Sequence, residues 1–441
     1  MPTDRLPPGK MGLPVIGQTL NFISDPDFYI KQYKKYGSLF KTRILGQPTV
    51  FAIGPDAVEF LLSTHMDCFS WEGGWPDTFK ILLGRSLFLQ DGEEHRRNRK
   101  LMMPAFHGAA LARYFDTMES IALSYLQRWE KQGELVWFEE MKQLTFDIAS
   151  QLLVGADSGE DVARLSQLFT TLTNGLFSLF PMQWQWTKFG KAVAARNSLL
   201  EHLTHVVRQR QENPTQDVLS LLVQTRDESG VGFTMTELTA QAMLLLFAGH
   251  ETTTSMLTWL CLELGRNPEI LQRAREEQQQ LSQQGPLSLE QVSQMPYLDR
   301  ILLEVERLHP PVGGGFRRVV KPFEFNGYQV PAGWLAIYSI LGTHRLDEIY
   351  PEPERFDPDR FADGKAKPFS LIGFGGGPRV CVGLAFAKLE MKIVAAHLLR
   401  GYRWELLPNQ SLKPVQVPTR HPKDGLRVRF EKLNLSDRED E

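Results

Sequence analysis

A glycine-rich stretch near the end of the chain carries the residue with the clearest chemical potential, Cys381. The stretch runs from Phe374 to Gly383 and reads Phe-Gly-Gly-Gly-Pro-Arg-Val-Cys-Val-Gly. Glycines let a backbone adopt positive φ and approach a flat ligand, and Pro378 removes one N–H donor. The apolar spacing of residues 384–401 predicts a helix, so Cys381 lies just ahead of a helix N-terminus. Free N–H groups and the helix dipole lower the pKa of a thiol there, which favours a metal-binding thiolate.

This thiolate would have to bind a metal as the only sulfur ligand, because Cys68 and Cys261 lie far away in the sequence. The chain contains no Cys-x-x-Cys spacing, which argues against zinc and iron–sulfur sites. The simplest remaining ligand set is a single axial sulfur on haem iron. Arg379, two residues before Cys381, would then bind a propionate.

The positions of five residues in this stretch match a known haem-binding loop. Phe374, Gly377, Arg379, Cys381 and Gly383 reproduce Phe-x-x-Gly-x-Arg-x-Cys-x-Gly, and the chain resembles the cytochrome P-450 monooxygenases. The resemblance implies a mainly α fold with a small β-rich subdomain, and haem b between a long central helix and the cysteine loop. It also implies that Cys381 is the axial iron ligand and that Phe374 and Arg379 contact the haem. The alternative is a glycine-rich turn with an inert buried cysteine.

A long apolar helix is predicted from Met235 to about Gly265. Thr234 and Glu237 have the spacing of a capping box at its start. Glu251 is the one charged side chain between Glu237 and Glu263. A carboxylate in such an apolar helix is costly to bury unless it has a partner or a task.

Glu251 lies in the sequence Ala248-Gly249-His250-Glu251-Thr252-Thr253. Gly249 weakens the helix and threonine hydroxyls compete for backbone carbonyls, so a local opening of the helix is predicted. The sequence matches the family's Ala/Gly-Gly-x-Asp/Glu-Thr motif. By resemblance, Thr252 donates a hydrogen bond during oxygen activation, Glu251 relays protons from solvent, and Ala248 and Gly249 border the haem. The alternative is a helix with an incidental glycine and an exposed acid.

Further haem contacts follow from the resemblance. His95 and Arg99 are four residues apart and share one helix face, while Arg97 faces away. They correspond to a family pair that binds the propionates, with histidine where many members have tryptophan, and Arg317 corresponds to a third propionate ligand. The other cations of residues 95–100 would form part of a basic patch for an acidic electron donor. A solvated helix face is the ordinary interpretation of such a charge run.

Three further residues match the family's structural ion network. Glu304 and Arg307 are three apart on one helix face and match the family's Glu-x-x-Arg, whose partner would be Arg360. The resemblance implies a buried triad that supports the cysteine loop, so we assign these residues to the fold.

Aromatic and apolar segments predict a substrate pocket. The aromatic loop around residues 174–190 corresponds by position to the family's substrate lid, with core packing as the alternative; an exposed apolar loop can also touch a membrane. Residues 310–317 correspond to a pocket-lining segment whose three glycines would let the backbone pass close to a ligand. The predicted pocket residues are Trp75, Phe177, Phe180, Phe247, Val312, Gly313 and Gly314.

The 441 residues contain no linker, repeat or low-complexity boundary, so one domain covering 1–441 is expected. Its parts would be an N-terminal β-rich part (1–65), a helical part (66–310) and a mixed β and haem-loop part (311–441). Residues 432–441 predict a disordered acidic tail.

The overall charge of −3 argues against a nucleic-acid partner. Three cysteines in a chain of this length predict a reducing compartment. The N-terminus contains no apolar run of the ~18 residues that an anchor needs, so we expect a cytoplasmic bacterial type of enzyme without a transmembrane anchor. A peripheral membrane contact stays open.

The resemblance implies that one oxygen atom from dioxygen is inserted into a C–H bond of a small apolar substrate. The cysteine loop and residues 310–317 look most like the retinoic-acid-hydroxylating branch, which implies a retinoid or an apocarotenoid. A separate ferredoxin and ferredoxin reductase are implied as electron donors, and a monomer is expected. Two alternatives remain: a peroxide-dependent or isomerising thiolate-haem enzyme, and a non-catalytic haem-bound ligand carrier.

Overall fold

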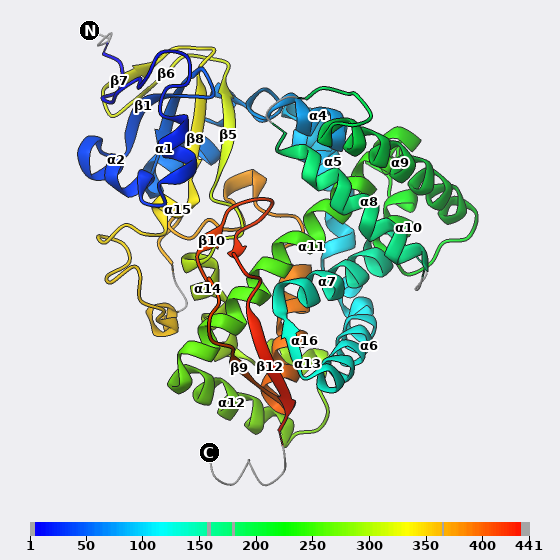
Figure 1. Ribbon diagram of the computed structural model, residues 1–441. Helices are drawn as coiled ribbons and strands as arrows, with labels where there is room; N and C mark the ends of the chain where they lie inside the picture. Colours follow the sequence, from blue (N-terminus) through cyan, green and yellow to red (C-terminus); the bar gives the residue numbers. More distant parts are fainter. Residues whose placement is uncertain (1–4, 157–159, 179–180, 364–365, 434–441) are drawn as a thin grey trace. The chain divides into compact units, whose positions relative to one another are not determined.

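The computed structural model describes residues 5–156, 160–178, 181–363 and 366–433 (Figure 1). Its internal contacts divide the chain into two units. Unit 1 comprises Met1–Pro76, Phe88–Asp91 and Glu306–Cys381, whereas unit 2 comprises Asp77–Leu87, Gly92–Val305 and Val382–Glu441. The mainly α fold with a small β-rich part, expected from the resemblance, is confirmed.

Unit 1 is organised by a five-stranded sheet with the strand order β1-β2-β8-β5-β3. Strands β1 and β2 form an antiparallel hairpin, and its turn residues Leu45 and Gly46 both have positive φ. β2 pairs in parallel with β8, and β8 pairs antiparallel with β5. The strands are β1 (Leu39–Ile44), β2 (Gln47–Ala52), β3 (Phe69–Ser70), β5 (Gly314–Val319) and β8 (Leu335–Ser339).

Aromatic packing anchors helix α2 (Phe28–Tyr36) to this sheet. Phe40 of β1 and Phe51 of β2 are fully buried, and their stacked rings lie 5.1 Å apart. Phe28 of α2 packs edge-on against Phe51, with the ring centroids 5.7 Å apart. Aromatic pairs of this geometry contribute about 0.5–1.5 kcal/mol beyond their buried area. This cluster therefore holds the sheet rigid beside the segments that carry the functional residues of unit 1.

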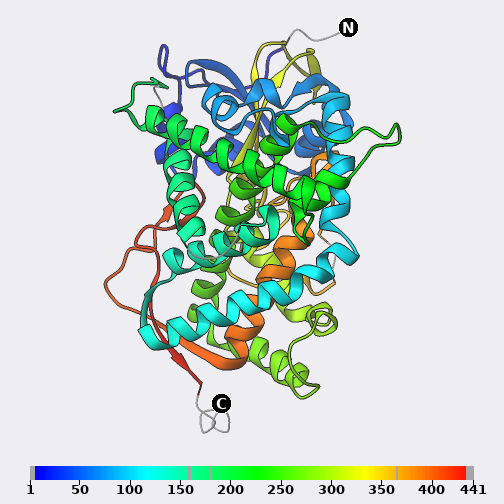
Figure 2. The ribbon, with the colours of Figure 1, turned by 90° about the vertical axis from the view of Figure 1, so that its right-hand side faces the viewer.

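Unit 2 is organised around helix α11 (Met235–Arg266), and Figure 2 shows it within the helices of this unit. The predicted capping box of Thr234 and Glu237 is confirmed. A helix of 32 residues is about 48 Å long at ~1.5 Å per residue. Helices α7 (Trp137–Val154), α9 (Lys188–Glu212) and α16 (Leu384–Gly401) pack against it, so most residues of α11 are buried.

The remaining elements complete the two units. Unit 2 also contains a three-stranded sheet of β4 (Glu134–Val136), β12 (Arg427–Lys432) and β9 (Tyr402–Leu406). The other helices are α1 (Thr19–Ser24), α3 (Pro55–Glu59), α4 (Asp77–Leu83), α5 (Gly92–Met102), α6 (Ala109–Gln132), α8 (Glu160–Leu176), α9 (Lys188–Glu212), α10 (Val218–Gln224), α12 (Pro268–Ser282), α13 (Leu289–Ser293), α14 (Pro296–Leu308), α15 (Ile340–Thr343) and α16 (Leu384–Gly401). The other strands are β6 (Phe323–Phe325), β7 (Tyr328–Val330), β10 (Pro414–Val415) and β11 (His421–Pro422).

Among the described residues, none of the helices combines the length and the apolar character needed to cross a bilayer. The prediction of a disordered tail concerns residues that lie almost entirely outside the described ones.

Candidate functional site

Cys381 is the accessible thiol of the chain. Its side chain is exposed, whereas Cys68 and Cys261 are buried. Burial raises the pKa of both buried thiols, and that of Cys261 rises well above its usual value. Because only a thiolate binds a metal, these two cysteines are poor ligands. The alternative interpretation of Cys381 as a buried cysteine is wrong, because its side chain is exposed.

The loop that carries Cys381 requires its glycines. Gly375 and Gly377 have φ values of 78° and 60°, which disfavour any residue with a side chain. A Cβ on Gly377 would also lie 2.5 Å from the carbonyl oxygen of Leu62. The backbone N–H of Cys381 donates a 2.8 Å hydrogen bond to the carbonyl oxygen of Phe374, which closes the loop. The sequence motif thus describes a turn that presents one sulfur atom to its surroundings.

Two arginines of unit 1 lie against one tryptophan ring. The guanidinium carbon of Arg317 is 3.0 Å from the ring centre of Trp71, and that of Arg379 is 4.6 Å from it. Arg379 also donates to the carbonyl oxygen of Gln90 at 2.7 Å and to Asp91 Oδ1 at 3.2 Å. The sequence predicted Arg317 and Arg379 as neighbours of one group, and the structure brings them together.

Arg317 shows that this cluster fits an anionic group. The side chain is 2% exposed, and its Nη2 atom is buried without a hydrogen-bond partner among the residues that the structure describes. Burial is the main cause that lowers the pKa of Arg317, to about 10, and the charge of Arg379 lowers it further. A buried cation with an unused donor is costly, and a carboxylate would satisfy both the charge and the donor. Haem propionates are such carboxylates, and the exposed thiol of Cys381 is the donor that haem iron accepts.

Helix α11 has one open patch in unit 2. From Leu238 to Leu264, every residue is buried except Phe247, Ala248, Gly249 and Thr252. Ala248 is exposed although it lies in the middle of a buried helix. These four residues are those that the sequence predicted for the oxygen-activating and pocket-lining part of the helix.

Glu251 points away from solvent and is ion-paired. Its side chain is 2% exposed, and Oε1 lies 2.9 Å from Lys142 Nζ and 3.5 Å from His250 Nε2. Burial raises the pKa of Glu251, but His250 and Lys142 outweigh this effect and lower the pKa to about 2. Neither carboxylate oxygen has a hydrogen bond of regular geometry. Its neighbours therefore keep Glu251 ionised although the side chain is buried.

The threonines of α11 bond back to their own helix. Thr252 Oγ1 donates a 2.9 Å hydrogen bond to the carbonyl oxygen of Ala248, and Thr254 Oγ1 donates to that of His250 at the same distance. Such bonds compete with the helical ladder and bend helices locally. A Cβ on Gly249 would lie 2.6 Å from Leu153 of α7, so this glycine also permits close helix packing. The sequence analysis predicted only its weakening effect.

Helix α5 carries His95 and Arg99, the other predicted propionate ligands. His95 is 5% exposed and Arg99 is half-buried. The spacing of four residues places both on one face of α5. They belong to unit 2, whereas Arg317 and Arg379 belong to unit 1.

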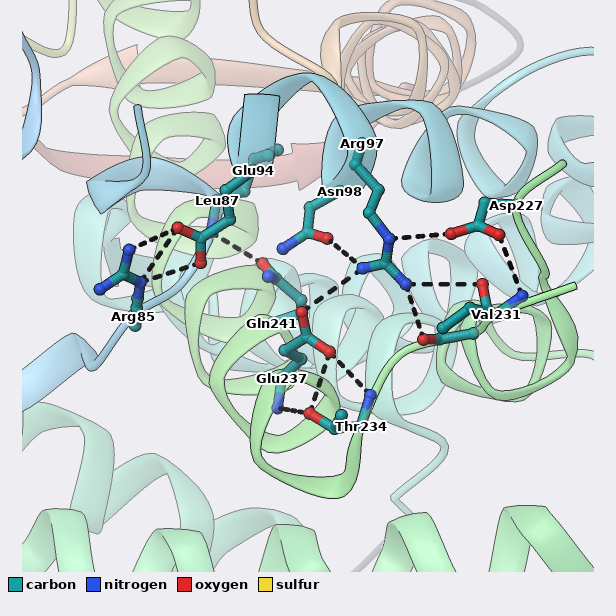
Figure 3. Close-up of polar contacts among 11 residues, drawn as sticks. Arg85, Leu87, Glu94, Arg97, Asn98, Asp227, Val231, Thr234, Glu237 and Gln241 are labelled. Atoms are coloured by element: carbon teal, nitrogen blue, oxygen red, sulfur yellow. Dashed lines mark hydrogen bonds and ion pairs between the residues drawn. The ribbon is translucent and has the colours of Figure 1, made fainter. Parts of the chain in front are cut away.

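Arg97 of α5 holds the start of α11. Its guanidinium donates to Asp227 Oδ2 at 2.9 Å and to the carbonyl oxygen of Gly232 at 2.8 Å, and it lies 3.5 Å from Glu237 Oε1 (Figure 3). Gln241 of α11 accepts a 2.9 Å hydrogen bond from the N–H of Leu87. Arg97, which was predicted to face away from His95 and Arg99, thus connects α5 to the loop before α11.

The cations left for a basic patch on α5 have acidic neighbours. Arg96 Nη1 lies 2.7 Å from Glu93, and Lys100 Nζ lies 2.5 Å from Glu228. All four side chains are more than two-thirds exposed, so solvent screens both pairs and neither contributes much to stability. An acidic partner would have to compete with these carboxylates.

The predicted pocket residues lie in several environments. Trp75 belongs to an aromatic cluster in which its ring is 4.7 Å from Phe88 and 5.2 Å from Phe316. Phe177 is 42% exposed and packs edge-on against Phe79 at 5.5 Å. Phe180 lies outside the described residues.

The glycines after Pro311 face a strand. A Cβ on Gly314 would lie 2.4 Å from the carbonyl oxygen of Tyr338, and one on Gly315 would lie 2.5 Å from the Tyr338 ring. The Cβ side of Gly314 and Gly315 therefore faces strand β8, and the approach of these glycines to a ligand stays a prediction. Gly313 is half-buried, and Val312 is 41% exposed.

Arg307 and Arg360, which were predicted to support the fold, donate hydrogen bonds to backbone carbonyl oxygens. Arg307 donates to the carbonyl oxygens of Pro353 at 2.7 Å and Arg355 at 3.2 Å, and Arg360 also donates to that of Arg355 at 3.2 Å. Glu304 and Arg307 are both fully buried on α14.

His344 extends this network to the cysteine loop. Its Nδ1 donates to the carbonyl oxygen of Arg307 at 3.1 Å, and its Nε2 accepts from the N–H of Ile372 at 2.8 Å. Burial lowers the pKa of His344 to about 3, so the ring is neutral. The sequence analysis missed His344, Asp91 and Lys142, because their partners are far away along the chain.

Comparison with known proteins decides the family. A family model described as cytochrome P450 matches residues 7–426. The chain belongs to the cytochrome P450 family. This P450 is 43% identical over 438 residues to the putative cytochrome P450 120 of Synechocystis, with 97% of each chain covered. It is also 35% identical to cytochrome P450 26A1 of Danio rerio, covering 96% of this chain and 90% of the other.

Other relatives of this P450 have different printed names. The β-amyrin 28-monooxygenase of Medicago truncatula is 34% identical, covering 94% of this chain and 91% of that protein. Among solved structures, the retinoic-acid-bound cyanobacterial CYP120A1 matches with a TM-score of 0.89 and 42% identity, covering 97% of this chain and 100% of the other. The chain is thus a P450 monooxygenase, and its family implies haem held by a cysteine thiolate.

Proposed function

We propose that this P450 hydroxylates a retinoid or a related apocarotenoid at a C–H bond. The observation that carries this proposal is the 42% identity to the retinoic-acid-bound structure of cyanobacterial CYP120A1. That similarity extends over 97% of the chain. Relatives named for β-amyrin have lower identity, and we treat that triterpene as the competing substrate class.

The residues of this chain fit haem b. Cys381 would be the axial ligand, and Phe374 would lie beside it in the loop. Arg317 and Arg379 would bind propionates, and His95 and Arg99 are the other predicted propionate ligands. When bound, the haem would supply the binding and reduction of dioxygen, so that one oxygen atom can enter a C–H bond.

Glu251 and Thr252 would handle protons in this reaction. Glu251 is ionised at neutral pH, because its pKa is lowered to about 2, so it can accept a proton from the solvent side. To pass a proton on, the carboxylate would have to turn from Lys142 toward the open patch of α11. The Thr252 hydroxyl donates to Ala248 in this structure and would have to leave that carbonyl to donate elsewhere.

Ala248 and Gly249 would border the haem. Phe247, Trp75, Phe177 and Val312 would contact the substrate. This assignment leaves the apolar part of a retinoid among aromatic side chains, which suits a conjugated chain.

Electrons would come from a ferredoxin and its reductase, and the protein would act as a monomer in the cytoplasm. Six large apolar residues of the N-terminal segment and the β1–β2 turn are more than 40% exposed: Leu13, Val15, Ile16, Leu20, Ile23 and Leu45. A peripheral membrane contact of an enzyme with an apolar substrate would use such residues.

A ligand titration tests the substrate class. All-trans-retinoic acid is expected to shift the haem to high spin at micromolar concentration, whereas β-amyrin and palmitate are not. Before the titration, the red-shifted absorption of the reduced protein with carbon monoxide verifies thiolate ligation. A haem-loaded protein that responds to β-amyrin and not to retinoids would refute the proposed substrate.

A turnover assay tests the reaction and the two alternatives. Product is expected with ferredoxin, reductase and dioxygen, and the Thr252→Ala variant should consume oxygen with much less product. Thr258→Ala is the control, since Thr258 makes the same kind of back-bond, to Thr254 at 2.8 Å, in a buried part of α11. Product with peroxide alone would favour the peroxide-dependent enzyme, and tight binding without product would favour the carrier.

A further inference from the structure

Asp91 of unit 1 connects the cysteine loop to the segment that follows β3. Its Oδ1 accepts from the N–H of Trp71 at 2.8 Å, and its Oδ2 accepts from Ser70 Oγ at 2.5 Å and from the N–H of Glu72 at 3.3 Å. Oδ1 also accepts from Arg379 Nη2 at 3.2 Å. The side chain of Arg379 is 6% exposed, whereas that of Asp91 is 34% exposed.

These contacts give Asp91 two separate roles in the cluster. It fixes residues 70–72, which carry the tryptophan ring that both arginines contact. It also places one negative charge among two guanidiniums, those of Arg317 and Arg379. The two arginines alone carry a charge of +2, and together with Asp91 the cluster carries +1.

The charge of Asp91 matters because Arg317 and Arg379 are little exposed. The interaction between charges near a protein interior is stronger than in water, and salt screens it less. A carboxylate fixed beside a propionate-binding cluster opposes the addition of an electron to the group bound there. The same carboxylate keeps Arg379 in place through a charge-assisted hydrogen bond.

We infer that Asp91 is a positioning residue that holds Arg379 and lowers the reduction potential of the haem. This inference rests on the proposed binding of haem by Arg379 and Arg317. In this inference Arg379 has two partners, a haem propionate and Asp91. Asp91 is part of the polypeptide and would therefore contact Arg379 both before and after haem binds.

Variants separate the two roles. Asp91→Asn removes the charge and keeps an acceptor for the N–H of Trp71, whereas Asp91→Glu keeps the charge. Ser70→Ala removes one contact of the carboxylate without changing its charge. Asp67→Asn is the charge control in unit 1, because Asp67 is 69% exposed and pairs with Lys321 at 2.8 Å on the surface.

The measurements are the midpoint potential of the purified holoenzyme and the rate of haem transfer to apomyoglobin. Asp91→Asn is expected to raise the midpoint potential, so that the ferrous-to-ferric ratio at a fixed potential rises severalfold. Ser70→Ala, Asp91→Glu and Asp67→Asn should leave this ratio near the wild-type value. Asp91→Ala should release haem about tenfold faster, as expected for the loss of a hydrogen bond to a charged group.

Two results would overturn the inference. One is a midpoint potential of Asp91→Asn that is equal to or lower than that of Asp67→Asn. The other is a Ser70→Ala variant that shifts the potential as much as Asp91→Asn does, since this would show a purely structural effect. If Asp91→Asn does not fold, an Asp91→Glu variant with an altered potential would also refute the role of the charge. Failure of the wild-type protein to take up haem would refute the proposed function itself.

Discussion

Replacing Lys142 by methionine tests how Glu251 is kept ionised inside α11. The pKa of Glu251 is lowered from 4.5 to about 2, and each pKa unit corresponds to about 1.4 kcal/mol. The ionised carboxylate therefore contributes about 3 kcal/mol to the free energy of unfolding. Because the folded pKa lies below the unfolded value, this contribution is present above pH 4.5 and is lost as the pH falls toward 2.

The Lys142→Met variant should lose stability in a pH-dependent manner. Removing one partner of a buried ion pair costs about 3–5 kcal/mol when the remaining charge stays buried. Once Lys142 is absent, burial raises the pKa of Glu251 and His250 still lowers it, so the carboxyl takes up a proton at a higher pH than in the wild type. We therefore expect a loss of about 3 kcal/mol at pH 8 and of about 1 kcal/mol at pH 5.

Urea unfolding at the two pH values measures this effect. The Glu251→Gln substitution should restore most of the stability of Lys142→Met, and the double-mutant cycle should give a coupling energy of about 3 kcal/mol at pH 8. Lys80→Met is the control, because Lys80 pairs with Asp77 on the surface of unit 2 and should cost less than about 1 kcal/mol. An equal loss at both pH values, without rescue by Glu251→Gln, would contradict the ion pair as the cause of the lowered pKa.

Three further predictions concern buried groups. Burial raises the pKa of Glu390 well above 4.5, and neither carboxyl oxygen has a hydrogen-bond partner among the described residues, so the free energy of unfolding falls as the pH rises above 4.5. Glu390→Gln should therefore raise the Tm at pH 8 and leave it unchanged at pH 4. Burial lowers the pKa of His344 from 6.5 to about 3, so the free energy of unfolding falls as the pH drops below 6.5. In His344→Gln, which can still contact Ile372, the free energy of unfolding measured with urea should change less between pH 6.5 and pH 4. Gly314→Ala should lower the free energy of unfolding by about 1–3 kcal/mol, because its Cβ would meet the Tyr338 carbonyl, and an unchanged value would contradict the close approach.

The sequence was sufficient for features that depend on local spacing. The capping box at Thr234 follows from residues three apart. The turn that presents Cys381 follows from glycines whose positive φ other residues disfavour. In each case the determining interactions lie within a few residues of one another.

The sequence was insufficient where a residue acts through a distant partner. The sequence did not show that Gly314 lies against Tyr338, because strand pairing in β5 and β8 decides what the Cβ side of a glycine faces. Arg97 was known to point away from His95, but the sequence held no signal for Asp227 as its partner. Pairing of this kind depends on how helices and strands pack, which residue spacing does not encode.

The amino-acid sequence by itself determined the family, the thiol at Cys381 and the acid–alcohol pair of Glu251 and Thr252. Only the tertiary structure decided the electrostatic state of these groups. The pKa of Glu251 depends on Lys142 of another helix, and the surroundings of Arg379 depend on Asp91, almost 300 residues earlier in the chain. Charges act through space over a few ångströms, so their effects become visible only when the folded chain brings them together.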